Sequence, residues 1–111
     1  MKIIAIDVET ADTGHICEIG VAEIDSGKIT GSKSWLVKPL CYPRMNPEHQ
    51  AIHGITNAQL EHAPTFKELW SELKYHIEGK LLVAHNAKFD IECLASEITR
   101  NGIKTYPIRY F

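Results

Sequence analysis

The sequence predicts one α/β domain, a mixed sheet of three antiparallel strands and further parallel strands with flanking helices. Three observations predict this fold class. The first third of the chain is rich in strand-forming residues separated by turn residues. The second half alternates apolar strand segments with amphipathic helical segments, as parallel strands joined by helical crossovers do. Finally, 111 residues are enough to enclose one hydrophobic core.

The three antiparallel strands come first. Residues 3–9 are rich in β-branched side chains, which favour strands. Residues 16–24 alternate between apolar and other side chains well enough to form a second strand. An Asp-Ser-Gly-Lys turn at 25–28 then predicts a hairpin into a third strand over about 29–37. Neighbouring strands joined in this way are antiparallel.

The middle of the chain contains little regular structure. Pro39, Pro43 and Pro47 interrupt any helix or strand there because proline has no backbone N–H to donate. Beyond them, residues 48–60 predict short helical pieces joined at Gly54.

A longer amphipathic helix follows this segment. Thr65 can cap its first turn, and Glu68, three residues on, completes a capping box. Gly79 ends the helix. One face collects the apolar side chains, which are Phe66, Leu69, Trp70, Leu73 and Ile77. That face is expected to pack on the sheet.

The last elements alternate strand and helix. Residues 81–84 form a continuous apolar run, as a strand buried on both faces does. Asn86 is placed to cap a helix over 87–100, which ends at an Asn-Gly pair. Residues 103–111 begin or form a fifth strand that contains Tyr106, Ile108, Tyr110 and Phe111.

Charge and cysteine content argue against an overall basic nucleic-acid-binding protein, a disulfide-stabilised domain and a zinc ribbon. The net charge of −2 provides no overall positive field, so nucleic-acid binding would have to be local. Cys17, Cys41 and Cys93 form no C-x-x-C pair and fit neither a disulfide framework nor a zinc ribbon. We find no signal peptide or membrane-spanning run. These features predict a cytoplasmic protein with no membrane partner.

Two acidic residues interrupt the first strand. Side chains alternate across a strand, so Asp7 and Glu9 share one face, with Cα atoms about 6.5 Å apart, opposite Ile6 and Val8. Two like charges in a partly dehydrated site repel each other unless a cation neutralises them. The alternative is that both carboxylates lie at a hydrated strand end and accept hydrogen bonds from backbone amides.

A third carboxylate favours the cation site over the hydrated strand end. Asp90 lies about one turn into the last helix, near the carboxyl ends of the parallel strands, where ligand sites of α/β sheets lie. Taken alone, Asp90 fits a first-turn residue favoured by the helix dipole. Combined with Asp7 and Glu9, it completes a set of oxygen ligands suited to Mg²⁺ or Mn²⁺, whereas paired thiolates that would indicate zinc are missing from the sequence.

Three motifs resemble a known family. "IDVET" at 6–10, "EHQAIHGIT" at 48–56 and "VAHNAKFD" at 83–90 resemble, in order and spacing, the DEDD-type (DEDDh-like) 3′→5′ exonucleases similar to the proofreading epsilon subunit of bacterial DNA polymerase III. The resemblance spans residues 3–107. It implies an RNase H-like fold and a pair of Mg²⁺ or Mn²⁺ ions. It also implies hydrolysis at the 3′ end of single-stranded DNA or RNA, with release of nucleoside monophosphates.

The same resemblance implies roles for individual residues. The catalytic metal ligands are Asp7, Glu9 and Asp90. The residues that match positions at the terminal nucleotide are Thr10, Glu48 and His53, and Asn86 and Phe89 are further candidates for substrate binding. Structural alternatives stay open: Thr10 ends a strand, His53 satisfies a turn, Asn86 shapes a turn and Phe89 packs. A zinc pair formed by His49 and His53 lacks a third ligand.

One part of the family pattern is missing. The family supplies its general base and last ligand as a His and an Asp on a late helix, but no His follows His85 and no Asp follows Asp90. We therefore expect residues 1–111 to be a single exonuclease-like domain, carboxyl-terminally incomplete, weak or inactive alone, with an uncovered apolar sheet face. The alternatives are a non-catalytic nucleic-acid-binding or assembly module, or a fragment that self-associates. A polymerase or a second copy would cover the sheet face.

Overall fold

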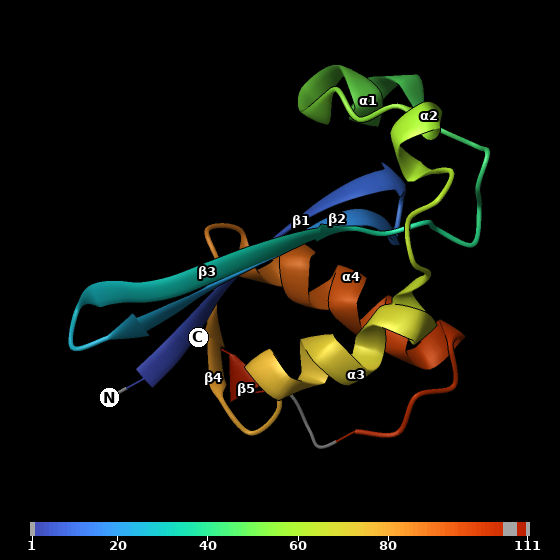
Figure 1. Ribbon diagram of the computed structural model, residues 1–111. Helices are drawn as coiled ribbons and strands as arrows, with labels where there is room; N and C mark the ends of the chain where they lie inside the picture. The colour runs from blue at the N-terminus through green and yellow to red at the C-terminus, as the bar shows by residue number, and fades with distance from the viewer. Residues whose placement is uncertain (1, 106–108, 111) are drawn as a thin grey trace.

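The computed structural model describes residues 2–105 and 109–110 as a five-stranded mixed sheet with helices against it (Figure 1). The strand order is β3-β2-β1-β4-β5. The strands are β1 (Lys2–Asp12), β2 (His15–Asp25), β3 (Lys28–Leu36), β4 (Leu81–Val83) and β5 (Arg109–Tyr110). The helices are α1 (Pro47–His53), α2 (Asn57–Leu60), α3 (Phe66–Ile77) and α4 (Ala87–Arg100).

The pairing of the strands confirms the predicted mixed sheet. β1 and β2 are antiparallel, as are β2 and β3, whereas β4 is parallel to β1 and β5 is parallel to β4. The predicted fifth strand is confirmed at Arg109 and Tyr110. The other residues predicted for it that carry large apolar side chains, Tyr106, Ile108 and Phe111, lie outside the described part of the chain.

β1 is longer than predicted and irregular near its end. Its register with β2 shifts between Glu9 and Thr10 and again between Thr10 and Asp12. Strict alternation fails there, and Thr10 and Ala11 are both buried. Such a bulge bends a strand and redirects its side chains. The bend therefore falls within the motif that contains the acidic pair.

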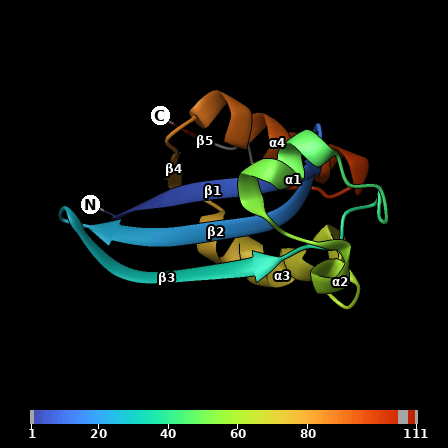
Figure 2. The same cartoon turned by 90° about the horizontal axis from the view of Figure 1, so that it is seen from above.

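α3 and α4 cover the same face of the sheet. Ile4, Ile6 and Val8 of β1 form one buried cluster with Leu73 of α3 and Leu94 of α4. Figure 1 shows both helices beneath the strands, whereas α1 and α2 lie near the far end of β1. Seen from above in Figure 2, α4 lies on the β1 side of the sheet and α3 on the side of β2 and β3. Burying this cluster is the main stabilising term, at about 25 cal/mol per Å² of apolar surface removed from water.

The opposite face of the sheet is lined by small side chains. Ala5 pairs with Ala22, and Asp7 pairs with Gly20 on the neighbouring strand. A groove of about 830 Å³ lies over these residues and continues to Val83. The expectation of an uncovered apolar face therefore agrees with the described residues, although small side chains form it.

The helix boundaries test the local predictions. Thr65 and Glu68 form the predicted capping box of α3. Gly54 joins the two short helices in a left-handed conformation (φ 71°), which glycine adopts at little cost. The cap predicted at Asn86 is wrong: Asn86 begins α4, but its φ of −119° and ψ of 72° are not those of an extended cap residue, and its side chain makes no capping hydrogen bond. Within the described ranges, no helix combines the length and apolar character needed to cross a bilayer.

Candidate active site

Asp7 and Glu9 project from β1 on the face opposite the helices. Ile6 and Val8 are buried against α3 and α4, while Asp7 is exposed and Glu9 half-buried. The alternation predicted from the sequence therefore holds up to Glu9. It places two carboxylates on one side of one strand, at the edge of the groove over the small residues.

Asp90 comes to these carboxylates from α4. Its side chain is only 3% exposed, and its carboxylate accepts a hydrogen bond from the backbone N–H of Val8, the residue between Asp7 and Glu9. Burial raises the pKa of Asp90, and the negative charges of Asp7 and then Glu9 raise this pKa further. The fold therefore places Asp90 within electrostatic range of Asp7 and Glu9, although about 80 residues separate them in the sequence.

Glu9 is affected by the same surroundings. Burial raises the pKa of Glu9, as does the charge of Asp7, whereas the nearby His53 lowers this pKa. The charged carboxylates thus destabilise one another, and a bound cation would relieve their repulsion. Within the described residues, no group of three or more His, Cys, Asp or Glu side chains forms a ready-made metal site. The oxygen donors and their repulsion, rather than a preformed coordination shell, fit a hard divalent ion.

His53 and His49 hold the bulged end of β1 from α1. The N–H of Ile55 donates to Nδ1 of His53 (2.9 Å), so Nε2 carries the proton and donates to the Thr10 carbonyl (2.9 Å). The Thr10 hydroxyl lies 2.8 Å from Nδ1 of His49. Both ring nitrogens of His53 are therefore bound within the protein, which agrees with the structural alternative for this residue and leaves its predicted substrate contact a proposal.

The remaining predicted substrate residues lie on the surface. Glu48 is exposed in the first turn of α1, and Asn86 is exposed at the start of α4. Phe89 is 39% exposed beside Asp90, so its ring is not fully packed in the core. The ring therefore offers apolar surface to solvent one residue before Asp90.

The sequence interpretation gave Glu97 no structural role and considered His49 only as a possible zinc ligand. Glu97 is 1% exposed and joins α4 to the start of β2, because its carboxylate accepts the N–H of Ile16 (3.0 Å). Arg100 donates to Glu97 (2.8 Å) and to the carbonyl of Gly14 (3.1 Å). The available signal was spacing: Glu97 lies seven residues after Asp90, on the same buried face of α4. His49 carried no such signal, because its bond to Thr10 joins two distant elements.

A family model described as "Exonuclease" matches residues 4–111, almost the whole chain. The chain belongs to this exonuclease family. The predicted resemblance to 3′→5′ exonucleases similar to the epsilon subunit is confirmed by a relative: the DNA polymerase III subunit epsilon of Treponema pallidum (strain Nichols) is 36% identical over 99 residues. That match covers 86% of this chain and 45% of the epsilon subunit.

Solved structures show that this exonuclease chain has the expected RNase H-like fold. Exonuclease X in complex with 5′ overhanging duplex DNA is 29% identical with a TM-score of 0.73, over 97% of this chain and 57% of that one. The nuclease domain of 3′hExo, a DEDDh family member bound to rAMP, is 21% identical with a TM-score of 0.74. That match covers 96% of this chain and 62% of the 3′hExo chain. The second likeness concerns the fold alone. This chain spans about half the length of the relatives, 45% to 62%.

Exonucleases of this family generally use divalent metal ions. Asp7, Glu9 and Asp90 influence one another electrostatically, and their carboxylates are oxygen donors of the kind that such ions prefer, so these residue types fit this chemistry. The other expected participants, a late His and a late Asp, have no counterpart in the sequence after His85 and Asp90.

Proposed function

We propose that this domain is a metal-dependent 3′→5′ exonuclease that hydrolyses the terminal phosphodiester of single-stranded DNA or RNA and releases nucleoside monophosphates. The observation that carries the proposal is the position of Asp90. Its buried carboxylate is bonded to the Val8 amide and feels the charges of Asp7 and Glu9. Three carboxylates so close would not be explained by packing alone, because their mutual repulsion lowers the stability of the folded domain.

Each of these residues has a defined task in the proposed reaction. Asp7, Glu9 and Asp90 would hold two Mg²⁺ or Mn²⁺ ions. When bound, such ions activate the attacking water and stabilise the leaving oxygen. The bond from His53 to the Thr10 carbonyl holds the bulged end of β1 next to Glu9, which fixes the position of the first two ligands.

Exposure supports three of the proposed substrate contacts. Phe89 presents its ring beside Asp90, and Glu48 and Asn86 present polar groups to solvent at the starts of α1 and α4. We propose that these residues, with Thr10 and His53, border the 3′-terminal nucleotide. Location in the cytoplasm is proposed from the free thiols of the three cysteines, which suit a reducing compartment.

The rate of the reaction depends on a general base. His85 is the last histidine of the sequence, and it is exposed near Asp90, whose pKa it lowers. The late histidine that serves as base in the family is missing from the sequence. For the 111-residue polypeptide assayed alone, we expect hydrolysis slower by about 10²–10⁴-fold than with a positioned base.

Hydrolysis of labelled oligonucleotides tests the proposal. Single-stranded DNA and RNA labelled at the 3′-terminal nucleotide are incubated with Mn²⁺ or Mg²⁺ and the wild type, Asp7→Asn or Glu92→Gln. Glu92 is exposed on α4 and serves as the matched control. We expect mononucleotide release that requires the ion, survives in Glu92→Gln and disappears in Asp7→Asn. Equal release by Asp7→Asn and the wild type, or release in excess EDTA, contradicts the proposal.

A second candidate is a non-catalytic nucleic-acid-binding or assembly module. The uncovered groove of about 830 Å³ over Ala5, Gly20 and Ala22 favours it, since a partner surface would bury this face. The epsilon relative is by name a subunit of a DNA polymerase, so a polymerase is one proposed partner and a second copy of this chain is another. Oligonucleotide binding without metal-dependent release, together with a concentration-dependent dimer in sedimentation, would favour this candidate.

A further inference from the structure

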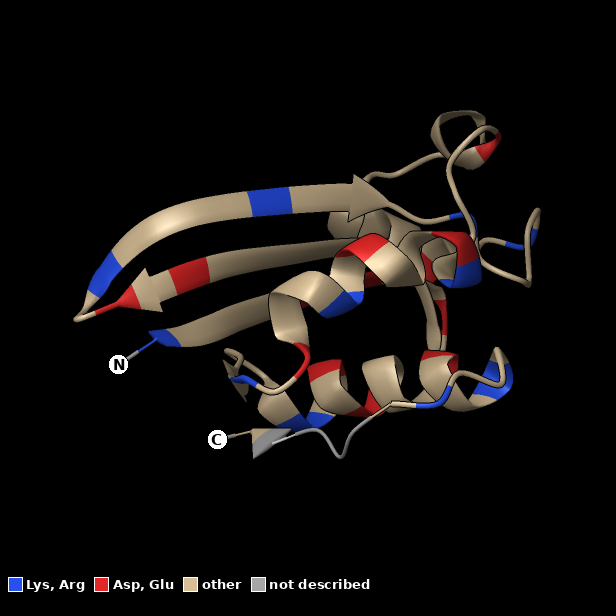
Figure 3. Ribbon diagram, turned by 60° about the horizontal axis from the view of Figure 1, so that its bottom comes forward, with Lys and Arg blue, Asp and Glu red and all other residues tan. Residues whose placement is uncertain are grey.

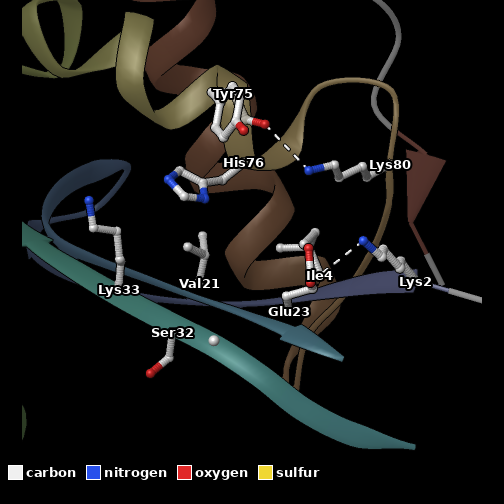
Figure 4. A pocket seen from close by; sticks show the side chains of 10 residues that line it. Lys2, Ile4, Val21, Glu23, Ser32, Lys33, Tyr75, His76 and Lys80 are labelled. Atoms are coloured by element: carbon white, nitrogen blue, oxygen red, sulfur yellow. Dashed lines mark hydrogen bonds and ion pairs between the residues drawn. The ribbon is translucent and has the colours of Figure 1, made fainter. Parts of the chain in front are cut away.

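A second pocket lies on the helix-covered side of the sheet, at the end of β1 remote from the carboxylates (Figure 4). Its volume is about 420 Å³, and it is lined by the start of β1, the second half of β2, the middle of β3 and the last turn of α3. Lys2 and Ile4 line it, on the face of β1 opposite that of Asp7. Nothing in the proposed reaction uses this pocket.

Three lysines surround the pocket mouth. Lys2 lies 4.0 Å from Glu23, and Lys33 lies 2.9 Å from Glu72. Lys80 donates to the carbonyl of Tyr75 (3.4 Å). The two ion pairs are substantially exposed to solvent. Exposed pairs contribute about 0–1 kcal/mol, so the lysines exchange partners readily.

The charge of this surface differs from that of the rest of the chain. Three lysines against Glu23 and Glu72 leave one positive charge, whereas the whole chain carries −2. Figure 3 shows that the positions of Lys and Arg are interspersed with those of Asp and Glu along the ribbon. An anionic ligand that binds here would therefore be recognised locally.

Aromatic rings stand in a row beside these lysines. Trp35 lies 5.5 Å from His76, and Tyr75 meets His76 edge-on at 5.4 Å, measured between ring centroids. Lys33 lies over Trp35 and Lys80 over Tyr75, each 5.8 Å from the ring centroid. The Tyr75 side chain is 78% exposed, so it contributes little to the packing of α3 on the sheet. An exposed ring next to an ammonium group offers a stacking surface and a charge to the same ligand.

Single-stranded nucleic acid uses both features. A base stacks on an aromatic ring with about 1–3 kcal/mol, and its phosphate attracts lysine. An acidic peptide would use the lysines but not the exposed Tyr75 ring. An apolar helix would have to bury the charges of Lys33 and Lys80, at a cost in desolvation.

We propose that Tyr75, Lys80, Lys33 and Lys2 form a second binding site for single-stranded nucleic acid, which holds nucleotides on the 5′ side of the terminal nucleotide. The proposal extends the proposed exonuclease function, because it assigns the far part of the same strand. Lys2 and Asp7 are five residues apart along β1, or about 17 Å, and lie on opposite faces. A substrate of about 3 nucleotides cannot bridge the two sites, whereas one of about 15 nucleotides can.

Binding to oligonucleotides of two lengths tests this site. Fluorescence anisotropy is measured in EDTA, where metal-dependent hydrolysis is suppressed. It gives the Kd of the wild type, Tyr75→Ala and Tyr75→Phe. The ligands are single-stranded DNA and RNA of about 3 and about 15 nucleotides. Tyr75→Ala should weaken binding of the long oligonucleotides about 5- to 150-fold, the equivalent of one stacked base, and leave the short ones unchanged. Tyr75→Phe keeps the ring and should bind like the wild type.

The outcomes separate this site from the proposed active site. If Tyr75→Ala binds the long oligonucleotides more weakly than the wild type and the short ones equally well, the second site is supported even when no hydrolysis is detected. Equal Kd values for wild type and Tyr75→Ala on the long oligonucleotides would overturn it, as would failure of the wild type to bind them. Displacement of the long oligonucleotide by poly-glutamate from wild type and Tyr75→Ala alike would also overturn it, because it would identify a general anion surface. Lys80→Ala should reduce the slope of log Kd against log salt concentration by about one.

Discussion

Replacing Glu97 with alanine should separate α4 from the β1–β2 hairpin. Glu97 is the buried carboxylate that accepts the N–H of Ile16 and the guanidinium of Arg100. Arg100 also donates to the Gly14 carbonyl, so the pair joins the last half of α4 to the turn between β1 and β2. The other half of α4 carries Asp90, whose position over β1 therefore depends on this connection.

The magnitude follows from the groups left without partners. In Glu97→Ala, the N–H of Ile16 remains buried and unsatisfied, at a cost of about 1–3 kcal/mol. The smaller side chain also leaves a void, which adds about 1 kcal/mol. Burial raises the pKa of Glu97, so removing the charge recovers part of this loss. We expect a net destabilisation of about 2–3 kcal/mol, a large share of the roughly 5–15 kcal/mol typical of a domain.

Thermal unfolding followed by circular dichroism measures this effect. At about 4 °C per kcal/mol, Glu97→Ala should lower the Tm by about 8–12 °C. Glu97→Gln keeps an acceptor for Ile16 and should cost less than about 1 kcal/mol. Glu92→Ala, exposed on the same helix, should change stability by no more than about 0.5 kcal/mol. If Glu97→Ala is as stable as Glu92→Ala, the connection described above does not hold α4 in place.

Three further predictions concern the buried titratable groups. Asp90→Asn should raise the Tm in metal-free buffer at neutral pH, because burial and the charge of Asp7 disfavour the charged form of the Asp90 carboxylate and raise its pKa. The same variant should lose metal-dependent hydrolysis. A lower Tm would contradict this reasoning, and Glu92→Gln, exposed on the same helix, is the control. Burial raises the pKa of Cys17 to about 12 and that of Cys93 to about 11, so iodoacetamide at pH 8 should modify both thiols only after unfolding, as read by mass spectrometry. Since the unfolded chain loses these protons near pH 9, the free energy of unfolding should fall as pH rises through that value; no change between pH 8 and 10 would contradict the assignment.

Sequence reasoning succeeded where the cause is local. The capping box of Thr65 and Glu68 involves residues three apart, and the left-handed turn at Gly54 depends on one residue. The outward direction of Asp7 and Glu9 follows from strand alternation alone. Asp90 was proposed from its place at the start of the last helix, near the carboxyl ends of the parallel strands, but no local rule could establish how closely it approaches β1.

Sequence reasoning failed where the cause is a partner from another element. Asn86 has a favoured capping residue type, but the backbone that leaves β4 holds it in a conformation that prevents the cap. The bulge at Thr10 depends on pairing with β2, and the ring of His53 is oriented by the Thr10 carbonyl and the Ile55 amide. Such contacts form only after the chain has folded.

By itself, the sequence determined the order of strands and helices, the acidic pair on β1 and the family to which the chain belongs, because these depend on neighbouring residues and on motif spacing. Only the tertiary structure decided that Asp90 is buried at the Val8 amide, that Glu97 joins α4 to β2, and that Tyr75 stands exposed beside the lysines. The physical reason is that burial and hydrogen-bond partners are set by elements far apart in the chain, and these meet when the sheet closes against α3 and α4.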